Sequence, residues 1–232
     1  MGTVPEEGIE MLWNRAELKF RAREVLSKNY LVCVLAAFVL GLMLSIDINQ
    51  ETLSYLELSF SSSFRVSIDI GEFLLNYLVV NILEIGICRF FVENRDYRAP
   101  LTKIFFGFRN GYYGRSFWIT FVRDVKIFLW TLLLVIPGIV KSYEYSMIPY
   151  ILAEQPDLSM GEAFDISRDM TDGQKWEMFV LDLSFLGWRL LTVVTLGLSE
   201  IFWTAPYYQA VRAELYAVLR NQFLAKYKKQ KE

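Results

Sequence analysis

Eighteen consecutive residues without a charged side chain, 29–46, constrain the fold of this chain more than any other feature. A helix of that length rises about 27 Å, which is close to the thickness of the hydrocarbon core of a bilayer. More apolar runs follow, and hydrophobic residues make up 54% of the sequence. Because the excess is gathered into runs, it indicates membrane helices rather than an unusually apolar soluble core.

The apolar runs predict an all-α, polytopic membrane helical bundle with about six transmembrane helices. The expected spans are 30–46, 73–91, 117–136, 138–153, 179–196 and 201–219. The whole chain, 1–232, is expected to form one integral membrane domain. Within it, 1–29 is a cytoplasmic segment with an interfacial amphipathic helix, 30–219 is the six-span bundle, and 220–232 is a basic cytoplasmic tail. The alternative for the N-terminal helix is that it packs on protein. The first loop, 47–72, carries many β-forming residues and is compatible with a small hairpin.

The distribution of cations predicts the orientation. Outside the expected spans, 17 Lys and Arg residues lie on the side of the N-terminus, whereas only Arg65 and Lys141 lie on the other side. Cytoplasmic loops carry the excess of Lys and Arg in membrane proteins. The count therefore predicts a multi-pass protein of the cell membrane with both termini in the cytoplasm.

A short amphipathic cytoplasmic helix is expected between the fourth and fifth spans. Ser159 and Glu162 have the spacing of a capping box, in which each residue satisfies an amide of the other. Gly173 is suited to end the helix. Apolar residues between them follow one face, and acidic residues follow the other.

Two charges follow a break in the charge-free stretch 127–140. Pro137 lacks an amide donor and Gly138 loosens the backbone, so the chain is expected to reverse here, at the outer surface, between the third and fourth spans. Lys141 and Glu144 would then lie in the first turns of the fourth span. They are three residues apart on one helical face, so we expect them to pair.

Several polar side chains fall inside the expected spans, where an unpaired charge is costly. Five charged residues among them are the candidate functional residues: Glu84, Lys141, Glu144, Asp182 and Arg189. Tyr77, Asn81, Glu84 and Cys88 share one face of the second span, which should contact other helices or a wet cavity. Asp182 and Arg189 are expected on nearly the same face of the fifth span. The alternative is that all these charges pair only to hold helices together.

The composition argues against most kinds of chemistry. The chain contains no histidine, the commonest general base and metal ligand, and its two cysteines lie in apolar runs. We expect no catalytic residues, no cofactor and no metal, and therefore no enzyme. The net charge of −2 gives no reason to expect a nucleic-acid partner.

Four stretches in this order resemble the bacterial membrane family called domain of unknown function 975. They are LWTLLLVIPGIVKSYEYSMIPYILAEQPDLS, GEAFDISRDMTDGQKWEMFVLDLSFLGW, TLGL and PYYQAVRAELY, and RAREVLSKNYLVCVL near the start is similar more loosely. The resemblance covers most of the chain outside 47–72. It implies six membrane spans and no assigned reaction.

Two functions remain open at this point. The first is a non-catalytic scaffold, regulatory or lipid-sensing membrane component, whose expected partner is membrane lipid, with a cytoplasmic or membrane protein as a second candidate. The alternative is a small-solute or ion transporter or channel that uses the charged residues within the spans.

Overall fold

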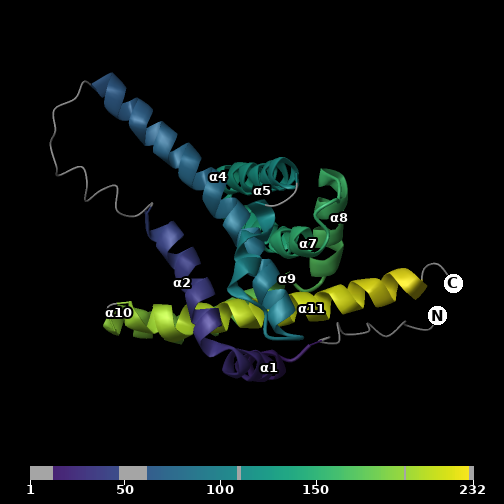
Figure 1. The fold of residues 1–232 in the computed structure, drawn as a ribbon. Coiled ribbons are helices and arrows are strands. Elements are labelled where there is room, and N and C mark those ends of the chain that lie inside the picture. The colour runs from purple at the N-terminus through teal and green to yellow at the C-terminus, as the bar shows by residue number, and fades with distance from the viewer. Residues whose placement is uncertain (1–12, 47–61, 109–110, 196, 230–232) are drawn as a thin grey trace.

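The computed structural model describes residues 13–46, 62–108, 111–195 and 197–229, and it contains no strand in these ranges (Figure 1). The all-α class is therefore confirmed. The elements in chain order are α1 (Arg15–Lys28), α2 (Tyr30–Ile46), α4 (Ser62–Asn94), the 3-10 helix η1 (Leu101–Phe108), α5 (Tyr113–Leu133), α6 (Val135–Glu144), α7 (Ile148–Glu154), α8 (Met160–Thr171), α9 (Lys175–Leu183), α10 (Leu186–Val194), the π-helix η2 (Glu200–Thr204) and α11 (Ala205–Lys229).

Taken singly, none of the helices in the described ranges combines the length and the apolar composition needed to cross a bilayer. One bent pair, Arg15–Lys28 with Tyr30–Gly41, meets both requirements by length and composition, with an angle of 104° between its two parts.

The helix boundaries agree with the sequence in some places and differ in others. The expected span 30–46 is the helix α2, and the expected tail is continuous with α11 as far as Lys229. The expected span 138–153 is divided between α6 and α7, and 179–196 is divided between α9 and α10.

The suggested β-hairpin in the first loop is wrong for the part that the structure describes. Residues 62–72 are the first turns of α4, and 47–61 lie outside the described residues. β-propensity depends strongly on context, and extending an existing helix adds one hydrogen bond for each residue fixed. The adjacent apolar helix therefore overrides the local preference.

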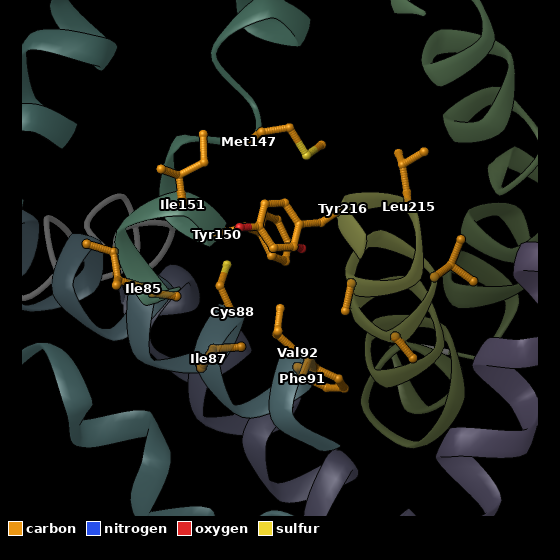
Figure 2. Close-up of a cluster of buried hydrophobic side chains, with 14 of the residues drawn as sticks. Ile85, Ile87, Cys88, Phe91, Val92, Met147, Tyr150, Ile151, Leu215 and Tyr216 are labelled. Carbon is orange, nitrogen blue, oxygen red and sulfur yellow. The ribbon is translucent and has the colours of Figure 1, made fainter. Parts of the chain in front are cut away.

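The core forms where α4, α7 and α11 meet. Every residue of α7 from Ile148 to Ala153 is buried. Figure 2 shows Cys88 and Val92 of α4 beside Tyr150 of α7 and Tyr216 of α11. The two tyrosine rings stack with centroids 5.2 Å apart. Both cysteines, Cys33 and Cys88, are free and buried, as expected for small apolar side chains.

The N-terminal helix α1 packs on protein along one side. Its residues Leu18, Ala22 and Leu26 are buried, and α1 lies against α11 in the fold (Figure 1). Phe20 on the other side is 69% exposed. The apolar residues of α1 therefore lie on two sides of the helix, one buried against protein and one exposed.

Two glycines allow helices to approach closely. A Cβ atom at Gly86 of α4 would lie 1.8 Å from the carbonyl oxygen of Ile104 in η1. A Cβ atom at Gly138 of α6 would lie 2.6 Å from the Cα atom of Thr131 in α5. Only a residue without a side chain fits at either position, and Gly138 thereby sets the spacing of the α5–α6 hairpin.

Candidate functional site

A cavity of about 470 Å³ lies between α4, α5, α7 and α11, with Leu40 of α2 at its edge. The predicted polar face of α4 is confirmed, because all four of its residues line this cavity. The lining residues are Leu40, Tyr77, Val80, Asn81, Glu84, Ile87, Cys88, Arg123, Ser146, Tyr150, Tyr208, Gln209 and Arg212. We call this space the central cavity.

One of the two cavity arginines is fully paired. The Nη2 atom of Arg123 lies 3.2 Å from Glu84 Oε2, and its Nε atom donates to Asp124 Oδ1 at 2.7 Å. Tyr77 donates its hydroxyl proton to the other oxygen of Asp124 at 2.6 Å. The positive charge of Arg123 is thus balanced by two carboxylates, one from the neighbouring helix α4 and one from the next residue of α5. Glu84, a predicted candidate, lies in the cavity wall.

The second arginine is not satisfied in the same way. Arg212 of α11 is only 9% exposed, and its buried Nη1 atom has no hydrogen-bond partner. The nearest acidic atom, Oδ1 of Asp182, is 3.9 Å from Nη1. Asp182 accepts hydrogen bonds from Tyr143 at 2.9 Å and from Tyr208 at 3.1 Å. The carboxylate of Asp182 is therefore engaged by two hydroxyl groups rather than by the guanidinium.

The prediction that Asp182 and Arg189 lie on nearly the same face of one continuous helix is wrong. The expected span is broken, since α9 ends at Leu183 and α10 begins at Leu186. Arg189 is exposed, whereas Asp182 is turned toward Tyr143, Tyr208 and Arg212. Seven residues place two side chains on one face only when the helix between them is continuous.

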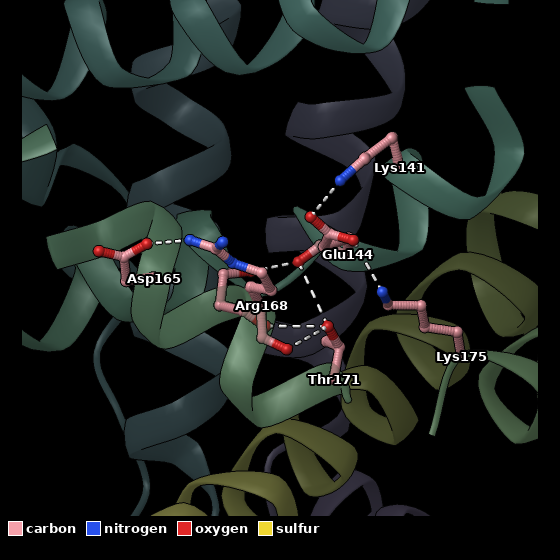
Figure 3. A network of polar contacts seen from close by, with 7 residues as sticks. Lys141, Glu144, Asp165, Arg168, Thr171 and Lys175 are labelled. Atoms are coloured by element: carbon pink, nitrogen blue, oxygen red, sulfur yellow. Dashed lines mark hydrogen bonds and ion pairs between the residues drawn. The ribbon is translucent and has the colours of Figure 1, made fainter. Parts of the chain in front are cut away.

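A second charged group surrounds Glu144 at the end of α6 (Figure 3). Lys141 Nζ lies 2.6 Å from one carboxylate oxygen of Glu144, and Lys175 Nζ lies 2.7 Å from the other. The side chain of Glu144 is 6% exposed, and each lysine side chain is 26% exposed. Ser167 also donates to the backbone carbonyl of Glu144, at 2.7 Å. The predicted pair of Lys141 with Glu144 is confirmed, with Lys175 as an additional partner.

The predicted position of this pair is wrong. The chain turns at Leu134, whose φ and ψ of −158° and 136° are extended, and Pro137 and Gly138 lie within the first turns of α6. Proline is tolerated at the start of a helix because the first amides have no partner there. Lys141 and Glu144 therefore lie in the last turns of α6, on the same side as Lys175.

The hairpin of α5 and α6 carries a concentrated apolar surface, which we call the apolar tip. Its side chains are between 40% and 75% exposed: Phe128, Leu129, Trp130, Leu132, Leu133, Leu134, Val135, Ile136, Ile139 and Val140. Lysines lie at its base. Lys126 Nζ is 3.8 Å from the centroid of the Phe164 ring, and Lys141 Nζ is 5.7 Å from that of Trp130.

The predicted capping box is confirmed at α8. Ser159 Oγ accepts from the Glu162 amide at 3.3 Å, and the Ser159 amide donates to Glu162 Oε2 at 2.9 Å. A hydrogen bond from the Ser159 hydroxyl, followed by that amide, lowers the pKa of the Glu162 carboxyl below its usual value. Gly173, just beyond the helix, has a φ of 70°, as expected of a helix stop.

Sequence reasoning missed Arg212 and Lys175 as partners of the predicted acidic residues. A signal for Arg212 was present, because Tyr208 and Arg212 are four apart and share a helical face, like the polar face of α4. No local signal joins Lys175 to Glu144, which is 31 residues away. Within the described ranges, no group of three or more Cys, Asp and Glu side chains is placed to hold a metal ion.

Part of the chain matches a known protein family. Residues 127–222 match the family described as Protein of unknown function (DUF975). The resemblance seen in the sequence is thus confirmed for this segment. It contains the apolar tip, Glu144, the capping box and Arg212, whereas Glu84 and Arg123 precede it. No curated protein and no solved structure matches the chain.

Proposed function

We propose that this chain is an integral protein of the cell membrane that acts without catalysis, as a scaffold, regulatory or lipid-sensing component. The observation that carries the proposal is the apolar tip. Contiguous apolar surface of this kind is rarely left in water by a soluble monomer, and it marks a surface that contacts another molecule or lipid.

The surroundings of the tip favour lipid as its partner. Lys126 and Lys141 lie where the apolar surface ends, and both contact aromatic rings. Lysines that extend toward headgroups and aromatic rings that lie at the interface are typical of the boundary of a membrane-embedded segment. A protein partner would not require these two lysine–aromatic contacts at the base of the tip.

Other exposed apolar side chains support the same proposal. Leu31 and Leu35 on α2 are 74% and 49% exposed. On α10 and the residues that follow it, Leu190, Val194 and Leu198 are each more than 60% exposed. Three separate segments therefore present apolar side chains outward, as in a protein that is solvated by lipid on several sides.

The contacts of Glu144 refine the proposed topology. Lys175 belongs to the segment expected in the cytoplasm, and it lies 2.7 Å from Glu144 at the base of the tip. We therefore propose that the α5–α6 hairpin enters and leaves the membrane from the cytoplasmic face. The charge-free residues before the turn, 127–133, rise about 10 Å, which is less than the half-thickness of the hydrocarbon core.

A re-entrant α5–α6 hairpin is compatible with the rest of the proposed topology. Two spans of the six-span scheme, 117–136 and 138–153, become one re-entrant hairpin. The number of crossings stays even, as two cytoplasmic termini require. Lys141 moves to the cytoplasmic side of the cation count, which leaves Arg65 alone on the other side.

A second candidate function is transport of a small solute or ion, and the observation in its favour is the central cavity. Charged side chains line it from helices in both the N-terminal and C-terminal parts of the chain. Flux into proteoliposomes that contain the purified protein would favour transport. A protein that binds lipid or a partner with no flux would favour the first function.

The membrane proposal can be tested with single cysteines in a background in which Cys33 and Cys88 are replaced by alanine. An environment-sensitive fluorophore at Ile136→Cys should be quenched by spin-labelled lipid, whereas the same fluorophore at Asp165→Cys should not. Absence of lipid quenching at both positions would overturn the proposal. Labelling of Ile136→Cys by an impermeant maleimide added outside intact cells would refute the re-entrant hairpin and support a full crossing.

A further inference from the structure

The guanidinium of Arg212 is buried, and its Nη1 atom has no hydrogen-bond partner among the described residues. It is 9% exposed, it lines the central cavity, and its Nη1 atom has no partner. A buried cation is strongly disfavoured unless an anion or several acceptors satisfy it. The unsatisfied Nη1 atom of Arg212 therefore marks a position where an acceptor from outside the chain would bind.

Asp182 is not that acceptor. Its Oδ1 atom is 3.9 Å from Arg212 Nη1, beyond hydrogen-bond distance, and its carboxylate accepts from Tyr143 and Tyr208. Two carboxylates engage Arg123, the other arginine of the cavity. Among the described residues, Arg212 is therefore the cavity arginine with a buried nitrogen, Nη1, that still lacks a hydrogen-bond acceptor.

We infer that the central cavity binds a small organic carboxylate through Arg212. A guanidinium presents two parallel N–H groups that match the two oxygens of a carboxylate. One positive charge that lacks a hydrogen-bonded anion suits a monoanion better than a phosphate dianion, which the acidic side chain of Glu84 in the cavity wall would repel more strongly. The volume of about 470 Å³ lies in the range of small-molecule sites.

The remaining walls suit the carbon skeleton of such a ligand. Val80 and Ile87 of α4 and Leu40 of α2 supply apolar surface, and Tyr150 and Gln209 supply polar atoms. Small-molecule sites usually combine apolar walls with a small number of polar groups. The inference does not depend on the membrane proposal, because it concerns only the interior of the chain.

The test is a binding titration of the purified full-length protein in detergent. Calorimetry measures the binding, and the melting temperature measures the stabilisation by each probe. The probes are butyrate and benzoate, each beside its neutral amide, butyramide or benzamide, and inorganic phosphate. We expect both carboxylates to bind and to stabilise the protein, and the amides to be weaker by about ten- to a hundredfold, the worth of a charge-assisted hydrogen bond. Equal binding of acid and amide, or no binding of either acid, would overturn the inference, as would phosphate that binds more tightly than the carboxylates.

Three variants separate a binding role from a structural one. Arg212→Met should abolish carboxylate binding, while Arg189→Met, which removes an exposed arginine, should not change it. Asp182→Asn removes the nearest competing charge, while its amide oxygen can accept from one tyrosine and its NH2 group can donate to the hydroxyl oxygen of the other, so it should tighten carboxylate binding several-fold. A folded Arg212→Met protein that still binds carboxylate, or an Asp182→Asn protein that binds it more weakly, would contradict the assignment. The second variant keeps the test decisive if the first does not fold.

Discussion

Replacement of Glu144 by glutamine tests the charged group that fixes the position of the α5–α6 hairpin. The change keeps the shape of the side chain and removes only the negative charge between Lys141 and Lys175. Loss of one partner from a buried ion pair typically costs about 3–5 kcal/mol, because the remaining charge is left unmatched. Each lysine side chain is 26% exposed and can extend its amine toward water, so we expect a smaller loss, about 2–3 kcal/mol.

The lysine variants make the expectation sharper. Lys141→Met alone leaves Lys175 at 2.7 Å from Glu144, so it should cost only about 1 kcal/mol. The double variant Lys141→Met/Lys175→Met leaves a carboxylate that is 6% exposed without either cation, and it should cost more than the two single changes summed. Adding Glu144→Gln to the double variant should recover much of that loss, since no unmatched charge then remains.

The measurement is the free energy of unfolding in detergent, from denaturant titrations followed by circular dichroism. Arg168→Met is the control, because Arg168 and Asp165 form an ion pair whose side chains are more than half exposed, and such pairs contribute little. Strictly additive losses across the Glu144 series would refute the three-membered group. A loss for Glu144→Gln no larger than that of the control would show that the carboxylate is not buried between two lysines.

Three further predictions concern local structure. Gly138→Ala should cost about 1–3 kcal/mol in unfolding free energy, because the new Cβ atom meets the backbone of Thr131. Gly161→Ala is the control and should cost none, because its Cβ atom meets nothing within 4 Å. Equal effects of the two changes would contradict the close approach at Gly138. Ser159→Ala should lower the stability of α8 by about 1 kcal/mol and speed amide exchange across 160–170, and unchanged exchange would count against the cap. Because hydrogen bonds lower the folded pKa of Glu162, its stabilisation is complete above the unfolded pKa and is lost as pH falls through the folded value. Glu162→Gln should therefore destabilise the protein at pH 7 and match the wild type more closely at about pH 3, a trend that unfolding at the two pH values would reveal.

The sequence predicted the features that depend on neighbouring residues. The helix α2 follows from an uninterrupted apolar run, and the start of α8 follows from two side chains three residues apart. The polar face of α4 was predicted from helical spacing, and it lines the central cavity. Each of these features is decided within a few turns of one helix, where spacing alone determines which side chains meet.

The features that were missed depend on where helices break and on what lies across the fold. The break at Leu134 precedes Pro137 by three residues, because proline fits the first turn of a helix as well as it fits a turn between helices. The break between α9 and α10 separates Asp182 from Arg189 without a proline or glycine at the boundary itself. The partners of Asp182 therefore come from α6 and α11, and no spacing within the fifth span predicts them.

The charges within the apolar runs have two different roles, and partner geometry separates them. Glu144 has two cations at hydrogen-bond distance and is almost fully buried, so its group is complete and needs no ligand. Arg212 is nearly as buried, but its closest anion is 3.9 Å away and already accepts two hydrogen bonds. A complete group holds elements together, and here it holds the base of the apolar tip beside α9. An incomplete group inside a cavity leaves a charged nitrogen without an acceptor, so Arg212 is the residue at which we expect a ligand of this protein to bind.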